Sequence, residues 1–293
     1  MYSFIKSQER GIPLHQKATN LNNSEDIISK EYYILSQIEN MKASRRDLFV
    51  VGYPQLDRYS DIKPFTYNTI KISSPYGYIN ASPINIGEKQ NLFISTQGPK
   101  QETIEDFWTM VYELKSKVII MLCNEYEGGR KKCERYWEKN MNRFKIIKQK
   151  MEDHYMYCIR EIKLINLLNK EERIVYQVHF TGWPDHGIPD YRDGKVFQVF
   201  SEINKLVDQL NDGQKPIIVH CSAGVGRTGT YVSMYLLEKE IDKQIGDKCP
   251  IIRINVFNLV RKIKEMRLYM VQTPQQYLFV YLFVDYLLKT RNT

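Results

Sequence analysis

The stretch of sequence that decides the fold reads His220-Cys221-Ser222-Ala223-Gly224-Val225-Gly226-Arg227-Thr228-Gly229. It follows an apolar run at 216–219 that is typical of a buried strand, and it precedes a run at 230–239 that is typical of a helix. The order strand, tight loop, helix aims backbone N–H groups and the positive end of a helix dipole into one small bowl. The sequence therefore predicts an anion-binding site at this loop.

The residues inside the loop suit a phosphate group. Gly224 and Gly226 permit positive φ and lack the Cβ atoms that would keep an anion away from the backbone. Arg227 can offer a planar fork to two phosphate oxygens. Cys221 stands at the mouth of the bowl, in a field that favours thiolate over thiol. Together these features predict a site at which sulfur attacks phosphorus.

Other uses of this loop fit less well. A nucleotide-binding P-loop needs Gly-Lys-Ser/Thr after the glycines, and no such triplet follows. A metal site needs a second Cys or His at ligand spacing, and only His220 is near in sequence. The remaining alternative is a buried cysteine on a glycine-rich turn that binds nothing. The strand before the loop and the helix after it argue against that alternative.

The ten residues resemble the signature loop of the cysteine-dependent protein tyrosine phosphatases, and other segments match that family in the same order. The further matches are Asp57-Arg58-Tyr59 with Asp61, Tyr78 to Ser82, Thr96 to Pro99, Glu105 to Trp108, Lys132 to Trp137, Trp183 to Gly187, and Gln272-Thr273 with Gln276. The resemblance spans roughly Ser24 to Leu288. It implies one α/β catalytic domain over residues 23–293, with a twisted, mixed central sheet flanked by helices on both sides. A flexible arm over residues 1–22 is expected before it.

The resemblance implies hydrolysis of phosphotyrosine in proteins through a cysteinyl-phosphate intermediate. Cys221 is the expected nucleophile, and Arg227 is expected to bind the phosphate. Asp185 lies in the segment that matches the family's mobile loop, and it is expected to act first as general acid and then as general base. No metal or other cofactor is expected.

Further residues receive roles by the same resemblance. His220 and Thr228 are expected to complete the surroundings of the thiolate, and a core histidine is the alternative for His220. Gln276, with Gln272, is expected to hold the hydrolytic water. The expected supporting residues are Glu127, which would orient the arginine, Lys132, Tyr136 and Trp183. A solvated turn residue is the alternative for Glu127.

Substrate recognition is expected to depend on the depth of the site. Tyr59 would line a deep slot and stack on the substrate ring, and Asp61 would hold the peptide backbone. The backbone expected to surround the phosphate belongs to Ser222, Ala223, Gly224, Val225 and Gly226. The chain departs from the family at Leu56-Asp57, where Lys-Asn is usual, and at Glu138, where proline is common. The first departure bears on the positioning of the recognition loop.

Bulk properties fit this interpretation. The 293 residues suit one large domain, and 43% hydrophobic and 26% charged residues are ordinary for a globular protein. The five cysteines are odd in number and lack framework spacing, which favours a reducing compartment. The N-terminus lacks the apolar stretch of a secretion signal, and Tyr277 to Leu288 is too short to span a bilayer. We therefore expect a monomeric cytoplasmic enzyme with no transmembrane segment.

The net charge of +8 favours negatively charged partners, and phosphotyrosine-containing proteins fit best. Two other functions stay open: a module that binds phosphotyrosine without turnover, and a phosphatase for RNA 5′ ends, against which Tyr59 argues. The basic stretch 130–150 is either a solvated surface or a docking patch.

The origin of the chain is a separate question. The heavy use of Ile, Lys, Asn and Tyr resembles the tyrosine phosphatases of large DNA viruses of insects, notably bracoviruses, which act in the host cytoplasm. A part of a larger cellular phosphatase is the alternative.

Periodicity and breakers also predict the elements. Helices are expected from Ser24, over 103–115, 193–210 and 255–266, and from Pro274 onward; strands are expected over 70–72, 77–84, 92–96 and 117–122, with antiparallel ribbons over 144–180.

Overall fold

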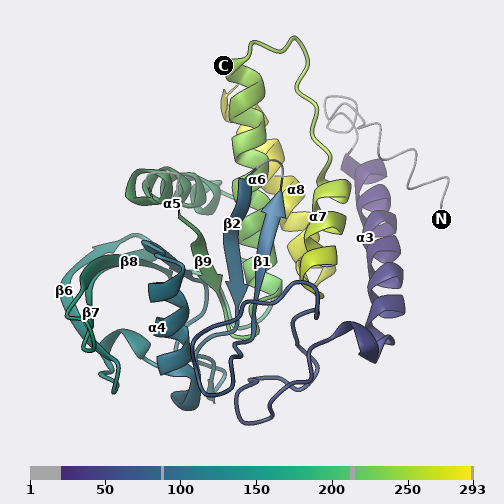
Figure 1. The fold of residues 1–293 in the computed structure, drawn as a ribbon. Coiled ribbons are helices and arrows are strands. Elements are labelled where there is room, and N and C mark those ends of the chain that lie inside the picture. Colours follow the sequence, from purple (N-terminus) through teal and green to yellow (C-terminus); the bar gives the residue numbers. More distant parts are fainter. Residues whose placement is uncertain (1–20, 87–88, 212–214, 292–293) are drawn as a thin grey trace.

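The computed structural model of the chain describes residues 21–86, 89–211 and 215–291. Its centre is a mixed sheet of seven strands in the order β1-β2-β9-β3-β8-β7-β6 (Figure 1). Helices cover both faces of this sheet, which confirms the predicted fold class. The expected arm over residues 1–22 lies outside the described residues as far as residue 20, and Leu21 already belongs to a helix.

The strands of the large sheet are β1 (Ala81–Ile86), β2 (Lys89–Thr96), β3 (Val118–Met121), β6 (Phe144–His154), β7 (Tyr157–Asn166), β8 (Glu172–Phe180) and β9 (Ile217–His220). The inner strands β2, β9, β3 and β8 run parallel, and the outer pairs are antiparallel. In register, His220 lies beside both Thr96 and Met121. Parallel strands end at one edge of a sheet, so the loops that follow these three residues meet there.

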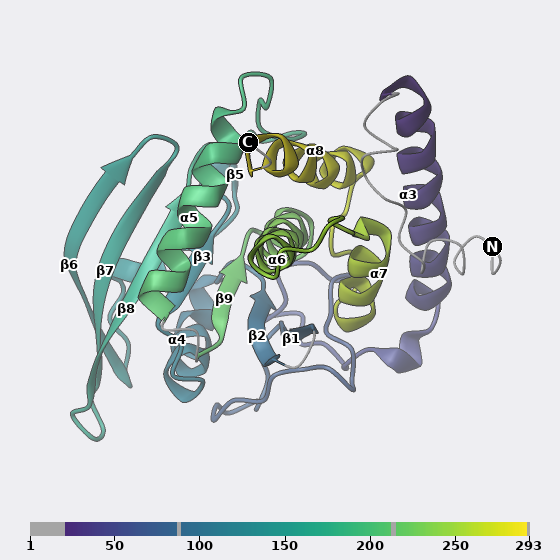
Figure 2. The same cartoon turned by 90° about the horizontal axis from the view of Figure 1, so that it is seen from above.

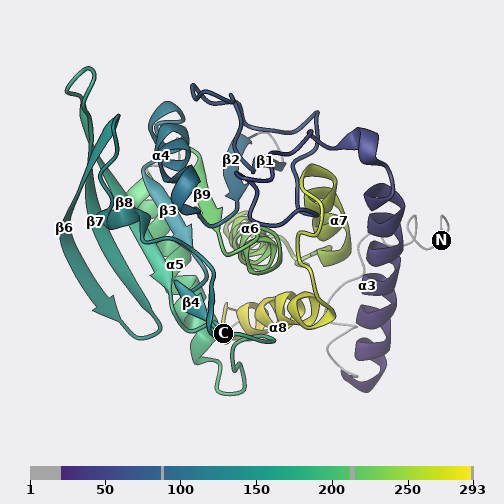
Figure 3. The same cartoon turned by 90° about the horizontal axis from the view of Figure 1, so that it is seen from below.

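Helices lie on both sides of the sheet (Figures 2 and 3). They are α3 (Leu21–Ala43), α4 (Ile104–Glu113), α5 (Lys195–Asn211), α6 (Gly226–Gly246), α7 (Val256–Met266) and α8 (Pro274–Arg291). Helix α4 covers one face, while α5, α6 and α7 cover the other, with α8 and α3 beyond them. A short hairpin of β4 (Tyr126–Glu127) and β5 (Arg130–Lys131) stands apart from the sheet. Among the described helices, none combines the length and apolar character that crossing a membrane would need.

Most element predictions are confirmed to within a few residues. Thr273 caps α8, because its hydroxyl accepts the Gln276 N–H at 3.2 Å. Asn255 caps α7, accepting the N–H of Asn258 at 2.8 Å. Helix α6 begins at Gly226, four residues earlier than the helical run suggests, so the last residues of the signature loop are its first turn.

One strand prediction is wrong, and another begins too early. Residues 70–72 form no strand, because a single ladder bond, from Ile70 N–H to Ala81 O at 3.3 Å, is followed by a turn at Ser74. The strand expected over 77–84 begins only at Ala81. A tight turn precedes it, in which Ala81 N–H bonds Ile79 O at 2.8 Å. The side chains of Tyr78 and Asn80 bond to Asp57, which holds this turn in place.

Candidate active site

The cysteine loop is held in a shape that only glycine permits at one position. Cys221 follows β9 directly, and its sulfur accepts the backbone N–H of Gly224 at 3.3 Å. Gly224 has φ of +73°, and a Cβ there would lie 2.1 Å from the carbonyl oxygen of Thr96. Helix α6 starts two residues later, with its positive end toward the loop. The loop therefore surrounds Cys221 with groups that stabilise negative charge.

Arg227 is fixed in direction by a carboxylate. Its two terminal nitrogens donate to the two oxygens of Glu127 at 2.6 and 2.9 Å, and the Glu127 side chain is buried. Arg227 also donates to the carbonyl oxygens of Leu122 at 3.2 Å and Pro184 at 3.1 Å. Burial is the largest single influence and works against the guanidinium charge, but the bond to Glu127, the Glu127 charge and the nearby cysteine sulfurs together outweigh it and raise the pKa of Arg227. The geometry thus places Glu127 where it holds a charged guanidinium still.

His220 is buried and neutral, and it belongs to a relay behind the cysteine. Gln177 donates to the Tyr136 hydroxyl at 2.7 Å, and that hydroxyl lies 2.8 Å from Nε2 of His220. Since the Cys221 carbonyl can only accept, Nδ1 carries the hydrogen and donates to it at 3.1 Å. Burial lowers the pKa of His220 to about 3, so the ring stays uncharged at neutral pH. The relay fixes the backbone that carries the sulfur.

The two hydroxyls of the signature loop, those of Thr228 and Ser222, lie in different surroundings. Thr228 is buried, and its hydroxyl has no hydrogen-bond partner among the described residues, so the expected bond to sulfur is not formed here. The Ser222 hydroxyl donates to Lys132 O at 3.0 Å and lies 2.9 Å from the Tyr59 hydroxyl. Ser222 therefore joins the signature loop to the recognition loop.

A cavity of about 270 Å³ opens over the cysteine. It gathers many of the expected site residues: Tyr59, Asp61, Glu127, Lys132, Cys221, Ser222, Ala223, Gly226, Arg227, Gln272 and Gln276. Gly226 keeps this space open, because a Cβ there would lie 3.0 Å from the side-chain amide of Gln276. The side-chain amide oxygen of Gln276, Oε1, accepts the backbone N–H of Gln272 at 2.8 Å, which fixes the direction of the Gln276 amide. The cavity is not lined by five other expected residues, which are buried: His220, Tyr136, Thr228, Gly224 and Val225.

Asp185 lies at the rim and outside the cavity wall. Its loop is anchored by the buried Trp183, whose indole N–H donates to Gly187 O at 3.2 Å, and by the bond between Pro184 O and Arg227. The Asp185 side chain is exposed and lies beside the turn at Gly128, where an added Cβ would be 3.3 Å from its carboxylate. The loop is thus tied to the arginine next to the exposed acid.

Arg58 holds the recognition loop in place. It belongs to the matched segment Asp57-Arg58-Tyr59, but the sequence predicts no role for it. Its side chain donates to Gly98 O at 2.9 Å and Pro99 O at 2.7 Å. Its backbone N–H donates to the Gln97 side chain at 2.8 Å. These bonds hold Tyr59 and Asp61 at the cavity.

Comparison with known proteins identifies the family to which this chain belongs. A family model described as protein-tyrosine phosphatase matches residues 53–286. The chain belongs to the protein-tyrosine phosphatase family. It is 35% identical over 241 residues to tyrosine-protein phosphatase 99A of Drosophila melanogaster, covering 77% of this chain and 18% of that protein. It is 34% identical over 237 residues to human receptor-type tyrosine-protein phosphatase C, covering 77% of this chain and 17% of that protein.

The phosphatase domain also resembles a solved structure. The crystal structure of the catalytic domain of human protein tyrosine phosphatase non-receptor type 18 matches with a TM-score of 0.75 and 28% identity, covering 88% of this chain and 95% of that one. The chain spans about a fifth or less of the length of the two relatives named above.

The unusual Asp57 of this phosphatase domain belongs to a buried network that sequence reasoning missed. One Asp57 oxygen accepts the Tyr78 hydroxyl at 2.6 Å and the Asn80 amide at 2.8 Å. Asn80 in turn accepts from Arg267 at 2.7 Å. Arg267 is fully buried and donates to the signature-loop carbonyls of Gly224 at 2.9 Å and Ala223 at 3.2 Å. A chain of polar contacts therefore joins Asp57 to the phosphate-binding loop.

We expect Asp57→Asn to lower the free energy of unfolding by about 1 kcal/mol and Asp57→Ala to lower it by about 2–3 kcal/mol. The asparagine keeps the acceptor oxygen and removes the charge that faces buried Arg267, whose pKa burial lowers to about 10. The alanine removes both. Urea unfolding measures the difference, with exposed Asp153→Asn as the control. A neutral or stabilising Asp57→Asn would show that the carboxylate charge does not support Arg267.

Glu138, the second departure from the family pattern, lies in the basic stretch 130–150, where acidic side chains pair with basic ones. Glu138 pairs with Lys148 at 2.8 Å and Arg135 at 3.4 Å on the surface. Lys131 pairs with Glu134 at 2.7 Å, and Lys150 pairs with Glu152. Much of the positive charge in the stretch 130–150 is therefore met by neighbouring acids, which favours a solvated surface over a docking patch.

Proposed function

We propose that this phosphatase domain hydrolyses phosphotyrosine in proteins through a cysteinyl-phosphate intermediate. One observation carries the proposal: Cys221 and an arginine locked by Glu127 share a cavity with Tyr59. A thiolate nucleophile, a fixed cation and an aromatic wall are the parts that an aryl phosphate needs.

In the first step, the Cys221 thiolate attacks phosphorus while the bond to the tyrosine oxygen breaks. Asp185 gives its proton to that departing oxygen, so tyrosine leaves as a neutral phenol. Arg227 and the loop N–H groups stabilise the charge on the three equatorial oxygens during transfer. Because Glu127 and the helix fix these donors beforehand, little reorganisation is needed when the charge moves.

In the second step, water attacks the cysteinyl phosphate and the sulfur leaves as thiolate. Asp185, now a carboxylate, takes the proton from this water. Gln276 lies on the cavity wall with its amide direction fixed, and it is assigned to hold the water in line. Thr228 is assigned to donate to the leaving sulfur after its free hydroxyl turns toward it.

Substrate class and setting follow as parts of the same proposal. The preferred substrates are phosphotyrosine proteins, because Tyr59 and Asp61 stand at the cavity. The proposed compartment is the cytoplasm, since all five cysteines are free and the chemistry needs a reduced thiol. The monomeric state and the insect-virus origin stay predictions from the sequence.

The test is turnover by the purified chain with EDTA present. We expect release of phosphate from a phosphotyrosine peptide, and more than about 100-fold lower kcat/KM for the matching phosphoserine peptide, whose phosphate the slot holds too far from sulfur. Binding of phosphotyrosine without release would indicate a binding module. Faster release from triphosphorylated RNA would indicate an RNA 5′ phosphatase. Either result would overturn the proposal.

A further inference from the structure

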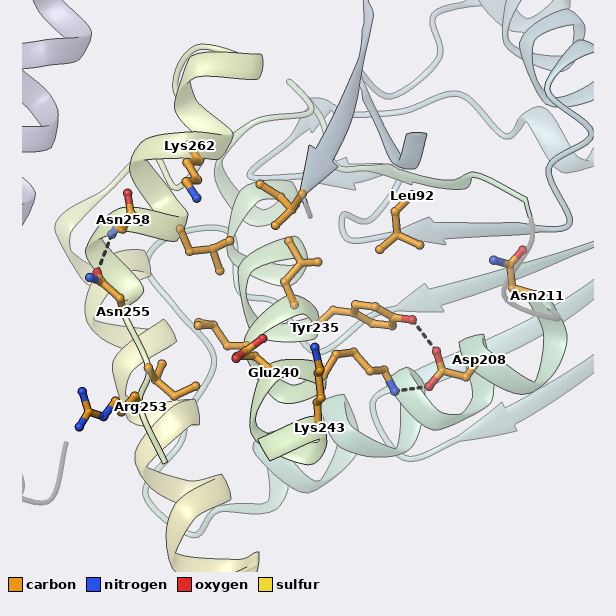
Figure 4. A pocket seen from close by; sticks show the side chains of 16 residues that line it. Leu92, Asp208, Asn211, Tyr235, Glu240, Lys243, Arg253, Asn255, Asn258 and Lys262 are labelled. Atoms are coloured by element: carbon orange, nitrogen blue, oxygen red, sulfur yellow. Dashed lines mark hydrogen bonds and ion pairs between the residues drawn. The ribbon is translucent and has the colours of Figure 1, made fainter. Parts of the chain in front are cut away.

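A second and larger cavity of about 730 Å³ lies along the C-terminal half of α6 (Figure 4). Its walls are α6 and α7, the ends of β1 and β2, and the last turn of α5. Its α6 residues begin at Tyr235, eight residues beyond Arg227, which places it about 12 Å or more along the helix from the active site. No step of the proposed hydrolysis uses it.

The bottom of this cavity is apolar. Ile86, Leu92, Leu236 and Leu259 line it and remain partly exposed. They come from four different elements, so this aliphatic floor is shared among β1, β2, α6 and α7 and is not the stripe of a single helix. An aliphatic ligand group that covered this floor would be stabilised by removing that surface from water.

The rim of the cavity carries spare positive charge. Lys239 is neutralised by Asp208, which also accepts the Tyr235 hydroxyl. Glu240 accepts from the neutral Gln244 amide at 2.7 Å and keeps its negative charge, so it offsets part of the positive charge on the rim. The rim cations without such a partner are Lys243, Arg253 and Lys262: their side chains are exposed and form no ion pair with any described residue. The rim therefore differs from the stretch 130–150, where acids meet much of the charge.

The cations are spread out rather than converging. Lys262 lies on α7 and Lys243 on α6, and Figure 4 shows their ammonium groups directed into the space between the helices from different sides. Arg253 lies at the outer end of the cavity. A single phosphate needs donors that converge on one point, as at the signature loop. Separate cations above an aliphatic floor fit a ligand with several separate carboxylates and apolar groups between them.

We propose that this cavity is an exosite for an acidic peptide segment of a protein partner, one in which aspartate or glutamate alternates with aliphatic residues. The acidic side chains would meet Lys243, Arg253 and Lys262, and the aliphatic ones would cover the floor at Leu236 and Leu259. Binding here goes beyond the proposed function and does not depend on hydrolysis.

The test uses fluorescence anisotropy with a fluorescein-labelled peptide in which glutamate and leucine alternate between serine spacers. We expect Lys243→Glu with Lys262→Glu to weaken binding roughly tenfold at low salt, as two reversed pairs of somewhat under 1 kcal/mol each would give. The control, Lys71→Glu with Lys145→Glu, makes the same change of charge at exposed lysines away from the cavity, and it should weaken binding less than about twofold. A peptide with serine in place of leucine should bind several-fold more weakly to the unaltered chain.

Each of three other outcomes would overturn the proposal of an exosite for an acidic peptide. Equal weakening by the control variant would mean a general attraction to a basic protein, and equal binding of the serine peptide would mean that the floor is unused. Failure of the peptide together with rim-dependent binding of phosphatidylserine vesicles would assign the cavity to a membrane surface instead. Turnover of p-nitrophenyl phosphate, measured on the same samples, should be unchanged in both variants. That assay reports separately on the proposed hydrolysis.

Discussion

Replacing Cys221 with serine is expected to lower kcat for a phosphotyrosine peptide by roughly 10⁴-fold or more, the scale on which enzymes lose their nucleophile. The serine hydroxyl is uncharged at neutral pH, so the Gly224 N–H and the α6 terminus have no anion to stabilise there. Substrate binding should persist, because Arg227 and Glu127 are untouched. Stopped assays measure kcat, and titration calorimetry with the same peptide measures binding.

Trapping the cysteinyl-phosphate intermediate tests directly whether Cys221 is the nucleophile. Acid quenching of the unaltered chain during turnover should trap phosphate on Cys221, seen as one added phosphate on its peptide by mass spectrometry. Cys249→Ser is the matched control, because Cys249 is exposed and remote in sequence, and it should change neither kcat nor the trapped species. Normal turnover by Cys221→Ser, or phosphate trapped on another residue, would contradict the mechanism.

The sequence predicts much of this site because the chemistry is local there. The glycines, the arginine and the cysteine of the signature loop share one strand–loop–helix unit, so spacing along the chain is spacing in space. The contact between Arg227 and Glu127 can be predicted only from the family resemblance, because 100 residues separate the two in sequence. The gap is closed by β3 and β9 lying side by side.

What the sequence could not predict are buried polar groups whose partners lie far along the chain. Arg267 ends an amphipathic basic helix, where arginines usually face water, yet it is fully buried under the signature loop. Gln177 offers one weak signal, because it is a polar residue two positions after the apolar Val175, on the same face of the strand and equally buried. Its partner Tyr136 is 41 residues away, so only the fold shows the relay to His220.

These groups explain how the loop keeps its shape. Carbonyl oxygens that point out of the bowl leave the N–H groups free to point in, and each outward carbonyl needs a donor. Arg267 supplies one for Ala223 and Gly224, and His220 supplies one for Cys221. The donors around the sulfur are therefore fixed by bonds on the far side of the loop, which is the preorganisation that electrostatic catalysis requires.

Replacing Asp185 with asparagine is expected to lower kcat for a phosphotyrosine peptide by about 10²–10⁴-fold, the usual contribution of a positioned acid. The amide keeps the shape of the exposed side chain and cannot give a proton to the leaving oxygen. The loss should be much smaller with p-nitrophenyl phosphate, because p-nitrophenol is a stronger acid than tyrosine and leaves without help. The ratio of the two losses separates proton transfer from damage to the loop.

A matched control stands next to it in the same loop. His186→Ala removes another exposed side chain between Trp183 and Gly187 and should change kcat less than about threefold for both substrates. If Asp185→Asn lowered both substrates equally, the residue would be positioning the loop through Pro184 and Arg227 rather than moving a proton. If the asparagine variant lost nothing with either substrate, another group would have to protonate the tyrosine oxygen. The other exposed carboxylates between β8 and α5 are Asp190 and Asp193, which pair with Arg192 and Lys195.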